Sequence, residues 1–397
     1  MADPLNILHT IGFDHLYPIV RAEIEISAPL DHDRLINAVD RVHHIIPELM
    51  QKYNLSNNQF LGGNFVLNDV LHFENTHQEK AAAKLDWERQ PQWAIYVTPK
   101  KLVIYGSHIL FDGAGFKELL YLLCQEYNST DEIKIVNHQD INGIQQLIQC
   151  VRPSASNNDH PAQALFMPEL ANQQKSQIQY RVVKQKLTTQ ELTRLHSKTK
   201  QAGVTLNDVL MAAFGKTIQQ YCGVDEINLA CPTDMRQYLP IEEQRQLRVQ
   251  NLTGRYNISV SAPLNESLFE TTKKVHQAMS REKEHYSFLE SFRPMLKNLA
   301  NGATVQQLQA DVEQNYHVRE IAYTNLAVVD DRRLHFAGTT TQGVVLSGGF
   351  RQLPHYQICV STFQSQLSLV ANVIGASSEI KLVASAMTMM RLYLLNY

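Results

Sequence analysis

A short strand that leads through a glycine-containing turn into a helix is the feature that most constrains how this chain can fold. Residues 102–105 are apolar and rich in β-branched and aromatic side chains, which is typical of a strand. From Phe116 onward, apolar residues recur with helical spacing. Three glycines interrupt the stretch between these two patterns: Gly106, Gly113 and Gly115. The sequence therefore predicts a strand-to-helix turn that displays His108 and Asp112.

The residues of this turn are suited to proton transfer. A histidine has an ordinary pKa near 6.5, so the His108 imidazole can act as a general base near neutral pH. The Asp112 carboxylate can bond the ring, or lock the turn through an arginine. Gly113 permits a backbone conformation that a Cβ would oppose. A structural histidine followed by an Asp-Gly turn explains the same spacing equally well, so the rest of the chain decides between the two interpretations.

Length and composition indicate a globular protein with more than one folding unit. A chain of 397 residues suffices for two lobes of about 150–200 residues each. Hydrophobic residues make up 44% and charged residues 19%, which excludes a disordered chain. The net charge of −3 gives no general attraction to nucleic acid or to anionic membranes. We therefore expect neither as a partner.

Cysteine usage and the apolar runs indicate a cytoplasmic location. The five cysteines are odd in number and form no C-x-x-C pair, which is typical of reduced thiols rather than a disulfide framework. The first residues lack the basic and apolar regions of a signal peptide. The most apolar later run, residues 382–390, is too short to cross a bilayer. We expect a monomer without a transmembrane segment.

The segment His108-Ile-Leu-Phe-Asp112-Gly113 resembles the active-site motif of a large acyltransferase superfamily. This superfamily includes chloramphenicol acetyltransferase, the condensation domains of non-ribosomal peptide synthetases, and alcohol acyltransferases. The resemblance implies that His108 is the general base and that Asp112 is structural and pairs with an arginine. Condensation domains usually carry a second histidine directly before the catalytic one. Ser107 occupies that position here, which favours a free-standing acyltransferase.

Further stretches agree with this resemblance and supply the arginine. Residues 232–236, which follow a predicted buried strand, resemble a family stretch that carries the structural arginine in several branches. Arg236 is therefore the candidate partner of Asp112, although a surface arginine after a strand is the simpler interpretation. Residues 251–257 resemble a stretch that borders the family's active-site tunnel, which places Asn257 near substrate.

Polar residues on the later strands complete the candidate site. Thr324 and Asn325 interrupt an apolar strand, and buried polar side chains need partners. A substrate carbonyl and a satisfied pair in the core explain them equally well. A serine or threonine on the last strands can donate to the oxyanion. The candidate substrate-binding residues are Ser107, Asn257, Thr324, Asn325, Ser361 and Thr362.

The resemblance predicts an α/β (α+β) fold with two chloramphenicol-acetyltransferase-like lobes. Each lobe is expected to be a mostly antiparallel sheet with helices on one side, and the active-site tunnel lies between them. We expect residues 1–176 to carry the motif and residues 177–397 to form the second lobe. The polar stretch 128–176 is the best candidate for a linker.

Several local expectations can be compared directly with a structure. Alternation over residues 20–26 predicts a strand with one buried face, and residues 65–71 are predicted to form a strand after a hairpin turn. Thr188 or Thr189, and then Thr205, are predicted to cap helices. His43 and His44 lack a third ligand at zinc spacing, so we expect no metal. They are expected to line the acceptor cavity or to cap their helix.

The chain is therefore predicted to transfer an acyl group from a thioester to an alcohol or amine. No permanently bound cofactor is expected, and acyl-CoA or acyl-phosphopantetheine acts as co-substrate. Acyl-CoA is favoured because the carrier-like string Leu61-Gly-Gly-Asn-Phe65 lacks the serine that bears the arm. The alternatives are amide formation on an acyl carrier protein, and an inactive binding scaffold. Four residues are candidates for binding the nucleotide: Arg245, Arg248, Lys100 and Lys101.

Overall fold

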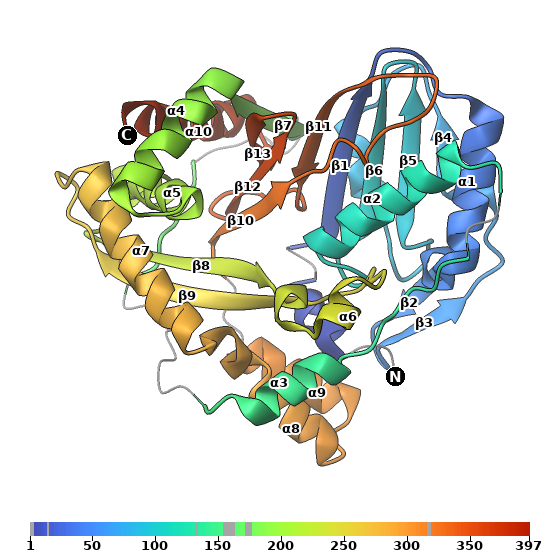
Figure 1. Ribbon diagram of the computed structural model, residues 1–397, viewed down its shortest axis with the longest axis horizontal. Helices are drawn as coiled ribbons and strands as arrows, with labels where there is room; N and C mark the ends of the chain where they lie inside the picture. Colours follow the sequence, from blue (N-terminus) through green and yellow to red (C-terminus); the bar gives the residue numbers. More distant parts are fainter. Residues whose placement is uncertain (1–3, 14–15, 132–133, 154–162, 171–176, 316–318) are drawn as a thin grey trace.

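The computed structural model describes residues 4–397 except 14–15, 132–133, 154–162, 171–176 and 316–318. Two main sheets lie beside each other, and the N-terminal half of the chain forms most of one of them (Figure 1). The first sheet has the order β11-β1-β6-β5-β4, and its strand pairs are antiparallel except β4 with β5. Its strands are β1 (Ile19–Ile26), β4 (Leu71–Phe73), β5 (Trp93–Thr98), β6 (Lys101–Ser107) and β11 (Thr341–Ser347). Two packed helices belong to this lobe: α1 (His32–Ile45) and α2 (Gly113–Asn128).

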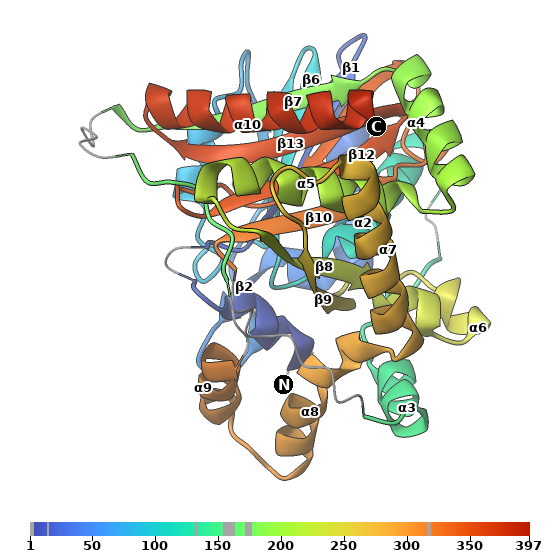
Figure 2. The ribbon, with the colours of Figure 1, turned by 90° about the vertical axis from the view of Figure 1, so that its left-hand side faces the viewer.

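The second sheet has the order β10-β12-β13-β7, with only β10 and β12 parallel. Its strands are β7 (Gln179–Leu187), β10 (Ile321–Val328), β12 (Tyr356–Phe363) and β13 (Gln366–Gly375). Figure 2 shows three helices on one side of this sheet: α4 (Thr189–Ala202), α5 (Leu206–Cys222) and α10 (Ser377–Asn396). The observed architecture is the predicted mixed fold of antiparallel-rich sheets covered by helices.

The remaining elements surround these two layers. Two small sheets are β2 (Gln51–Asn54) with β3 (Gln59–Gly62), and β8 (Glu226–Asp234) with β9 (Thr253–Ser261). The other α-helices are α3 (Asn142–Cys150), α6 (Ile241–Gln244), α7 (Leu268–Glu284), α8 (Arg293–Ala300) and α9 (Val305–Asn315). The 3-10 helices are η1 (Pro4–Thr10), η2 (Pro47–Met50), η3 (Leu67–Asp69), η4 (Glu79–Lys84), η6 (Met235–Tyr238) and η7 (Ser287–Ser291).

The two lobes exchange chain segments. Strand β11 lies in the second half of the sequence, yet it pairs with residues 21–26 of β1 in the first sheet. In return, apolar side chains of η1 are buried in the core of the second lobe. Each lobe therefore contains a segment from the other part of the chain. The division into residues 1–176 and 177–397 stays a prediction.

Local capping follows the sequence. The Thr188 and Thr205 hydroxyls accept hydrogen bonds from the backbone N–H groups of Glu191 and Asp208, and both helices begin with a capping box. Residues 93–97 and 102–106, with the turn at residues 98–100 between them, predict a hairpin, and β5 and β6 form it with Ile95 opposite Ile104. These interactions involve residues close in sequence, which explains why the pattern alone could predict them.

Strand β1 differs from its prediction, because both of its faces are buried. Its polar residues Arg21 and Glu23 do not face solvent but belong to a buried ion-pair network, in which the Arg21 guanidinium binds the carboxylates of Glu23 and Glu79. Lys184 of β7 donates to Glu23 at 2.7 Å, so the network also joins the two sheets. Burial of these charges is tolerated because each has a partner.

Two other segments also differ from prediction. Residues 65–71 were expected to be a strand, but residues 67–69 form η3, because the Asp69 carboxylate accepts from the Val66 N–H and closes a turn. The predicted linker 128–176 contains helix α3, which places Ile144 in the core of the second lobe. Residues 154–162 and 171–176 of that stretch lie outside the described residues.

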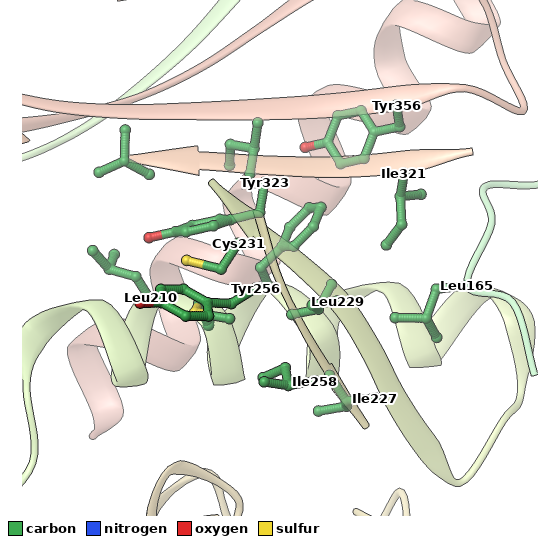
Figure 3. Close-up of a cluster of buried hydrophobic side chains, with 14 of the residues drawn as sticks. Leu165, Leu210, Ile227, Leu229, Cys231, Tyr256, Ile258, Ile321, Tyr323 and Tyr356 are labelled. Atoms are coloured by element: carbon green, nitrogen blue, oxygen red, sulfur yellow. The ribbon is translucent and has the colours of Figure 1, made fainter. Parts of the chain in front are cut away.

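The core of the second lobe packs against the strands that border the active-site region. Figure 3 shows Cys231 of β8, Tyr256 of β9 and Tyr323 of β10 gathered in this core. All three residues are at most 5% exposed. The β8–β9 hairpin is thereby fixed against the second sheet, and it carries polar residues from this core towards the first lobe.

The pairing of Glu23 predicts a stability difference with a defined pH range. Burial raises the pKa of Glu23, but the charges of Arg21 and Lys184 lower it to about 2, against an ordinary value of 4.5. The contribution of the Glu23 carboxylate to the free energy of unfolding is therefore fully present above about pH 4.5 and is lost as the pH falls towards 2. We expect Glu23→Gln to lower the free energy of unfolding at pH 7 by about 3 kcal/mol.

Thermal or urea unfolding of both proteins between pH 7 and pH 3 measures this difference. It should shrink once the pH drops below about 4.5. Glu25→Gln, on the same strand, is the matched control. A constant difference across this range would show that the Glu23 charge is not what stabilises the fold.

Candidate active site

The turn that carries His108 is fixed by backbone and side-chain bonds from other segments. Strand β6 ends at Ser107, whose carbonyl accepts from the N–H groups of Leu110 and Phe111. The His108 N–H donates to the carbonyl of Pro18 at 3.0 Å. The Asn251 amide donates to the carbonyls of His108 at 3.1 Å and of the next residue at 2.6 Å. The backbone around His108 is therefore held from the first lobe and from the segment that precedes β9.

The Asp112 carboxylate is the most heavily bonded group of the site. Its Oδ1 accepts from the Gly115 N–H at 2.7 Å and caps helix α2. Its Oδ2 accepts from the Leu252 N–H at 2.7 Å, the Thr253 hydroxyl at 2.8 Å and Arg236 Nη1 at 3.0 Å. The predicted pair of Asp112 and Arg236 is thus confirmed as a contact.

Arg236 ties this carboxylate to the second lobe. Its Nη1 also donates to Asp234 at 2.9 Å, and its Nη2 donates to the carbonyls of Arg248 and Gln250 at 3.0 and 2.8 Å. Burial raises the pKa of Asp112, but the Arg236 charge and these hydrogen bonds lower it to about 2. Asp112 is therefore an anion at neutral pH, and its environment suits a structural role rather than proton transfer.

The glycine of the motif is constrained by contact rather than by backbone conformation. Gly113 begins helix α2 and has no positive φ, so the predicted conformational reason is wrong. A Cβ at this position would lie 2.2 Å from Leu326 Cδ2 of the second lobe. At Gly115 a Cβ would lie 2.8 Å from the Gln250 carbonyl oxygen. Both glycines permit close approach of the two lobes beside His108.

A cavity of about 350 Å³ lies between the lobes and exposes His108. Residues from both sheets, from η1 and from the β8–β9 hairpin line it. Of the predicted substrate-binding residues, Thr324 and Asn325 line this cavity. The Asn325 amide already donates to Asn207 and accepts from Ala327, so it is engaged within the protein.

The other predicted substrate-binding residues do not line this cavity: Ser107, Asn257, Ser361 and Thr362. Ser361 is buried in β12 opposite Ser368 of β13, and the Thr362 carbonyl accepts from the Val329 N–H. Ser107 is buried beneath the turn. The structure brings none of these four side chains together with His108 in the cavity.

Two further polar residues line the cavity: His9, which has no signal in the sequence, and Ser347, one of the serines on the last strands that the sequence suggests as oxyanion donors. The His9 ring of η1 stacks on the His108 ring, with 4.3 Å between ring centroids and 21° between planes. Ser347, at the end of β11, lines the same cavity. Its hydroxyl accepts from Asn372 at 3.0 Å, which leaves its own proton available to donate. His9 belongs to no recognisable motif, and both residues reach the site through the exchange of segments between the lobes.

Both stacked imidazoles favour the neutral form. Burial lowers the pKa of His108, and the nearby Asp112 charge opposes this shift. The pKa of His9 lies well below its ordinary value, because burial and the His108 charge both lower it. The pair is therefore uncharged at neutral pH, which leaves His108 able to accept a proton.

The other histidine pair and the expected basic residues lie elsewhere. His43 is buried and accepts from Trp93 Nε1 at 3.0 Å, whereas His44 is exposed, so neither lines the cavity. Among the described residues, no group of three potential ligands could hold a metal ion. Arg248 is buried and paired with Asp140 and Glu243, which removes it as a phosphate ligand.

The remaining nucleotide-binding candidates also lie outside the cavity lining: Lys100, Lys101 and Arg245. Lys101 begins strand β6 whereas His108 follows its end, so the two are about 20 Å apart along an extended strand. Lys100 and Lys101 therefore lie at the wrong end of β6 to flank a mouth beside His108.

In the part of the chain that the structure describes, no helix is long and apolar enough to cross a membrane.

We predict that the Asp112–Arg236 pair is a main source of stability. Asp112→Ala and Arg236→Ala should each lower the free energy of unfolding by about 3–5 kcal/mol, because each leaves the other charge buried and unpaired. The double variant should lose less than the sum of the two. Urea unfolding of the four proteins measures this.

The exposed pair of Glu118 and Arg333, with oxygen and nitrogen 2.7 Å apart, is the matched control. Its two alanine variants should change the free energy of unfolding by at most about 1 kcal/mol. Additive losses at Asp112 and Arg236 would mean that the two residues do not act as a pair.

No family model and no curated protein matches the sequence of this chain. Solved structures do match its fold along nearly the whole chain. Polyketide synthase associated protein 5 from Mycobacterium tuberculosis has a TM-score of 0.68 at 15% identity, over 99% of this chain and 96% of that one. The trichothecene 15-O-acetyltransferase from Fusarium sporotrichioides has a TM-score of 0.66 at 10% identity, covering 99% and 94%. The first condensation domain of the CDA synthetase has a TM-score of 0.64 at 13% identity, also covering 99% and 94%.

These likenesses agree with the motif of residues 108–113 and with the cavity between two sheets. At identities of 10–15% they concern the fold. The chain therefore has the same two-lobed fold as these three solved structures.

Proposed function

We propose that this chain transfers an acyl group from a thioester to an alcohol or amine, with His108 as the general base. The observation that carries the proposal is the position of a neutral His108 on a rigid turn in a cavity lined by both lobes. The fold is also one in which solved structures are described as an acetyltransferase and as condensation domains.

The residues of the cavity support a simple course for the reaction. His108 takes the proton of the acceptor as its oxygen or nitrogen attacks the thioester carbonyl. The tetrahedral intermediate then collapses, the carbon–sulfur bond breaks, and the departing thiolate takes the proton from the His108 imidazolium. The stacked His9 ring holds the plane of the base. The Ser347 hydroxyl, whose oxygen already accepts from Asn372, is our candidate donor to the oxyanion.

We expect His108→Gln to lower turnover by about 10²–10⁴-fold while the fold is kept, because general-base catalysis contributes about this much. The assay follows thiol release from acyl-CoAs of several chain lengths with a panel of alcohols and amines. His44→Gln is the matched control, since His44 lies on the surface of α1 with 74% of its side chain exposed. Turnover near the wild-type value in a folded His108→Gln protein would remove His108 from the mechanism.

We further propose that the donor is a diffusible acyl-CoA rather than an acyl carrier protein. Support comes from Phe65, which stands where a carrier sequence has its serine. A second candidate, condensation on a carrier, is favoured by the likeness to condensation domains. Because Arg248 is paired and the two lysines lie far from His108, the preference for CoA no longer rests on those residues.

The donor is tested with purified protein and no carrier present. We expect thiol release from acyl-CoA that depends on the acceptor. Release from an acylated carrier only, at every chain length tested, would reverse the choice of donor. Release from neither donor would favour the inactive binding scaffold.

A further inference from the structure

Arg351 lies in the same cavity as His108 and forms no ion pair with a carboxylate of the described residues. Arg351 follows the end of β11, and both it and His108 line the cavity. Its Nε donates weakly to the neutral side chain of Gln357, at 3.4 Å. Its Nη1 is buried without any hydrogen-bond partner. Among the described residues, no carboxylate forms an ion pair with this guanidinium, in contrast to the buried Arg21, Arg236 and Arg248.

The backbone of Arg351 is fixed, so the side chain is presented from a rigid support. Its N–H donates to the Asn372 carbonyl at 3.0 Å, and its carbonyl accepts from the Ile374 N–H at 2.8 Å. Arg351 thereby forms a bridge to strand β13 opposite Val373. Residues that bind ligands are best placed on rigid elements, and the backbone of Arg351 meets this condition.

The charge of the cavity wall points to the same kind of ligand. Among the described residues, four cationic side chains line it, Lys117, Arg255, Arg319 and Arg351, of which Arg255 and Arg319 have further interactions within the protein. Asp234 supplies the one carboxylate of the described lining. That carboxylate is already bound to Arg236. The described lining therefore holds more cationic side chains than carboxylates, although the whole chain has a net charge of −3.

A guanidinium whose buried Nη1 makes no hydrogen bond is unfavourable unless a ligand supplies the missing acceptor. Burial lowers the pKa of Arg351 to about 10, so the guanidinium is still charged at neutral pH. Removal of a partner from a buried ion pair is strongly destabilising, and Arg351 lacks such a partner from the outset. A purely structural arginine would not be expected to keep this arrangement, whereas a ligand that supplies the negative charge accounts for it.

We propose that Arg351 is the binding residue for a carboxylate on the substrate, so that the acyltransferase acts on an acidic acceptor or an acidic acyl group. This inference rests on the proposed function for the identity of the two substrates. A planar carboxylate matches the guanidinium, which can donate two parallel hydrogen bonds to it. The phosphates of CoA do not meet this requirement, because the pantetheine arm separates them from the thioester that must lie beside His108.

Binding measurements test the anion site without requiring turnover. Isothermal titration of the full chain with hexanoate and with hexanamide compares two probes that differ only in the head group. We expect the wild-type protein to bind hexanoate at least about tenfold more tightly, as a charge-assisted hydrogen bond implies. Arg351→Gln should abolish this preference and Arg351→Lys should retain part of it.

The matched control is Arg245→Gln, which changes an exposed arginine outside the cavity lining and should leave the preference intact. Equal binding of the two probes by the wild-type protein, no binding of hexanoate, or an unchanged preference in Arg351→Gln would each overturn the proposal. Thermal unfolding gives a second measurement. Arg351→Gln should not lower the unfolding temperature, because it removes an unpaired charge, and a clear decrease would instead indicate a structural role.

Two further arms distinguish the acyl group from the acceptor as the source of the carboxylate. Tighter binding of succinyl-CoA than of butyryl-CoA, lost in Arg351→Gln, assigns it to the acyl group. Binding of hexanoate that persists at saturating butyryl-CoA assigns it to the acceptor. Acyl transfer without any carboxylate preference would refute this inference alone, whereas a carboxylate preference without transfer would refute the proposed function alone.

Discussion

The buried carboxylate of Asp112 is the group on which the arrangement of the site depends. It accepts from the first turn of α2, from the start of β9 and from Arg236, so three separate segments meet on one side chain. An unpaired buried charge is costly, hence these segments are stable only together. The turn that orients His108 and the junction between the lobes are therefore formed by the same set of hydrogen bonds. Loss of one element should loosen both.

The exchange of segments explains how a cavity of this size stays open between two packed lobes. Strand β11 completes the first sheet, η1 is buried in the core of the second lobe, and Lys184 bonds Glu23 across them. The chain segments that pass from one lobe to the other therefore fix the relative position of the lobes, in addition to the contacts between them. The crossings also bring His9 and Ser347 to His108, so the same topology that fixes the lobes supplies part of the cavity wall.

Sequence patterns could predict what depends on neighbouring residues. The caps at Thr188 and Thr205 and the hairpin before His108 are local, and a known motif supplied the Asp112–Arg236 pair. Features that depend on the third dimension could not be predicted. Ser361 is buried in β12 but does not line the cavity. The sequence does not show that Arg248 is paired, because Asp140 is distant in sequence and meets it only in the fold.

The charge of Arg351 and the basicity of His108 are linked. The Arg351 charge is one of the influences that lower the pKa of His108, in addition to burial. A substrate carboxylate bound to Arg351 would cancel that charge, and the pKa of His108 would then rise towards its ordinary value. A base with a higher pKa accepts a proton more readily. It follows that an acidic substrate would strengthen the base on binding, while in the empty cavity His108 stays neutral beside His9. Arg351 thus couples the binding of an acidic substrate to the ability of His108 to accept a proton.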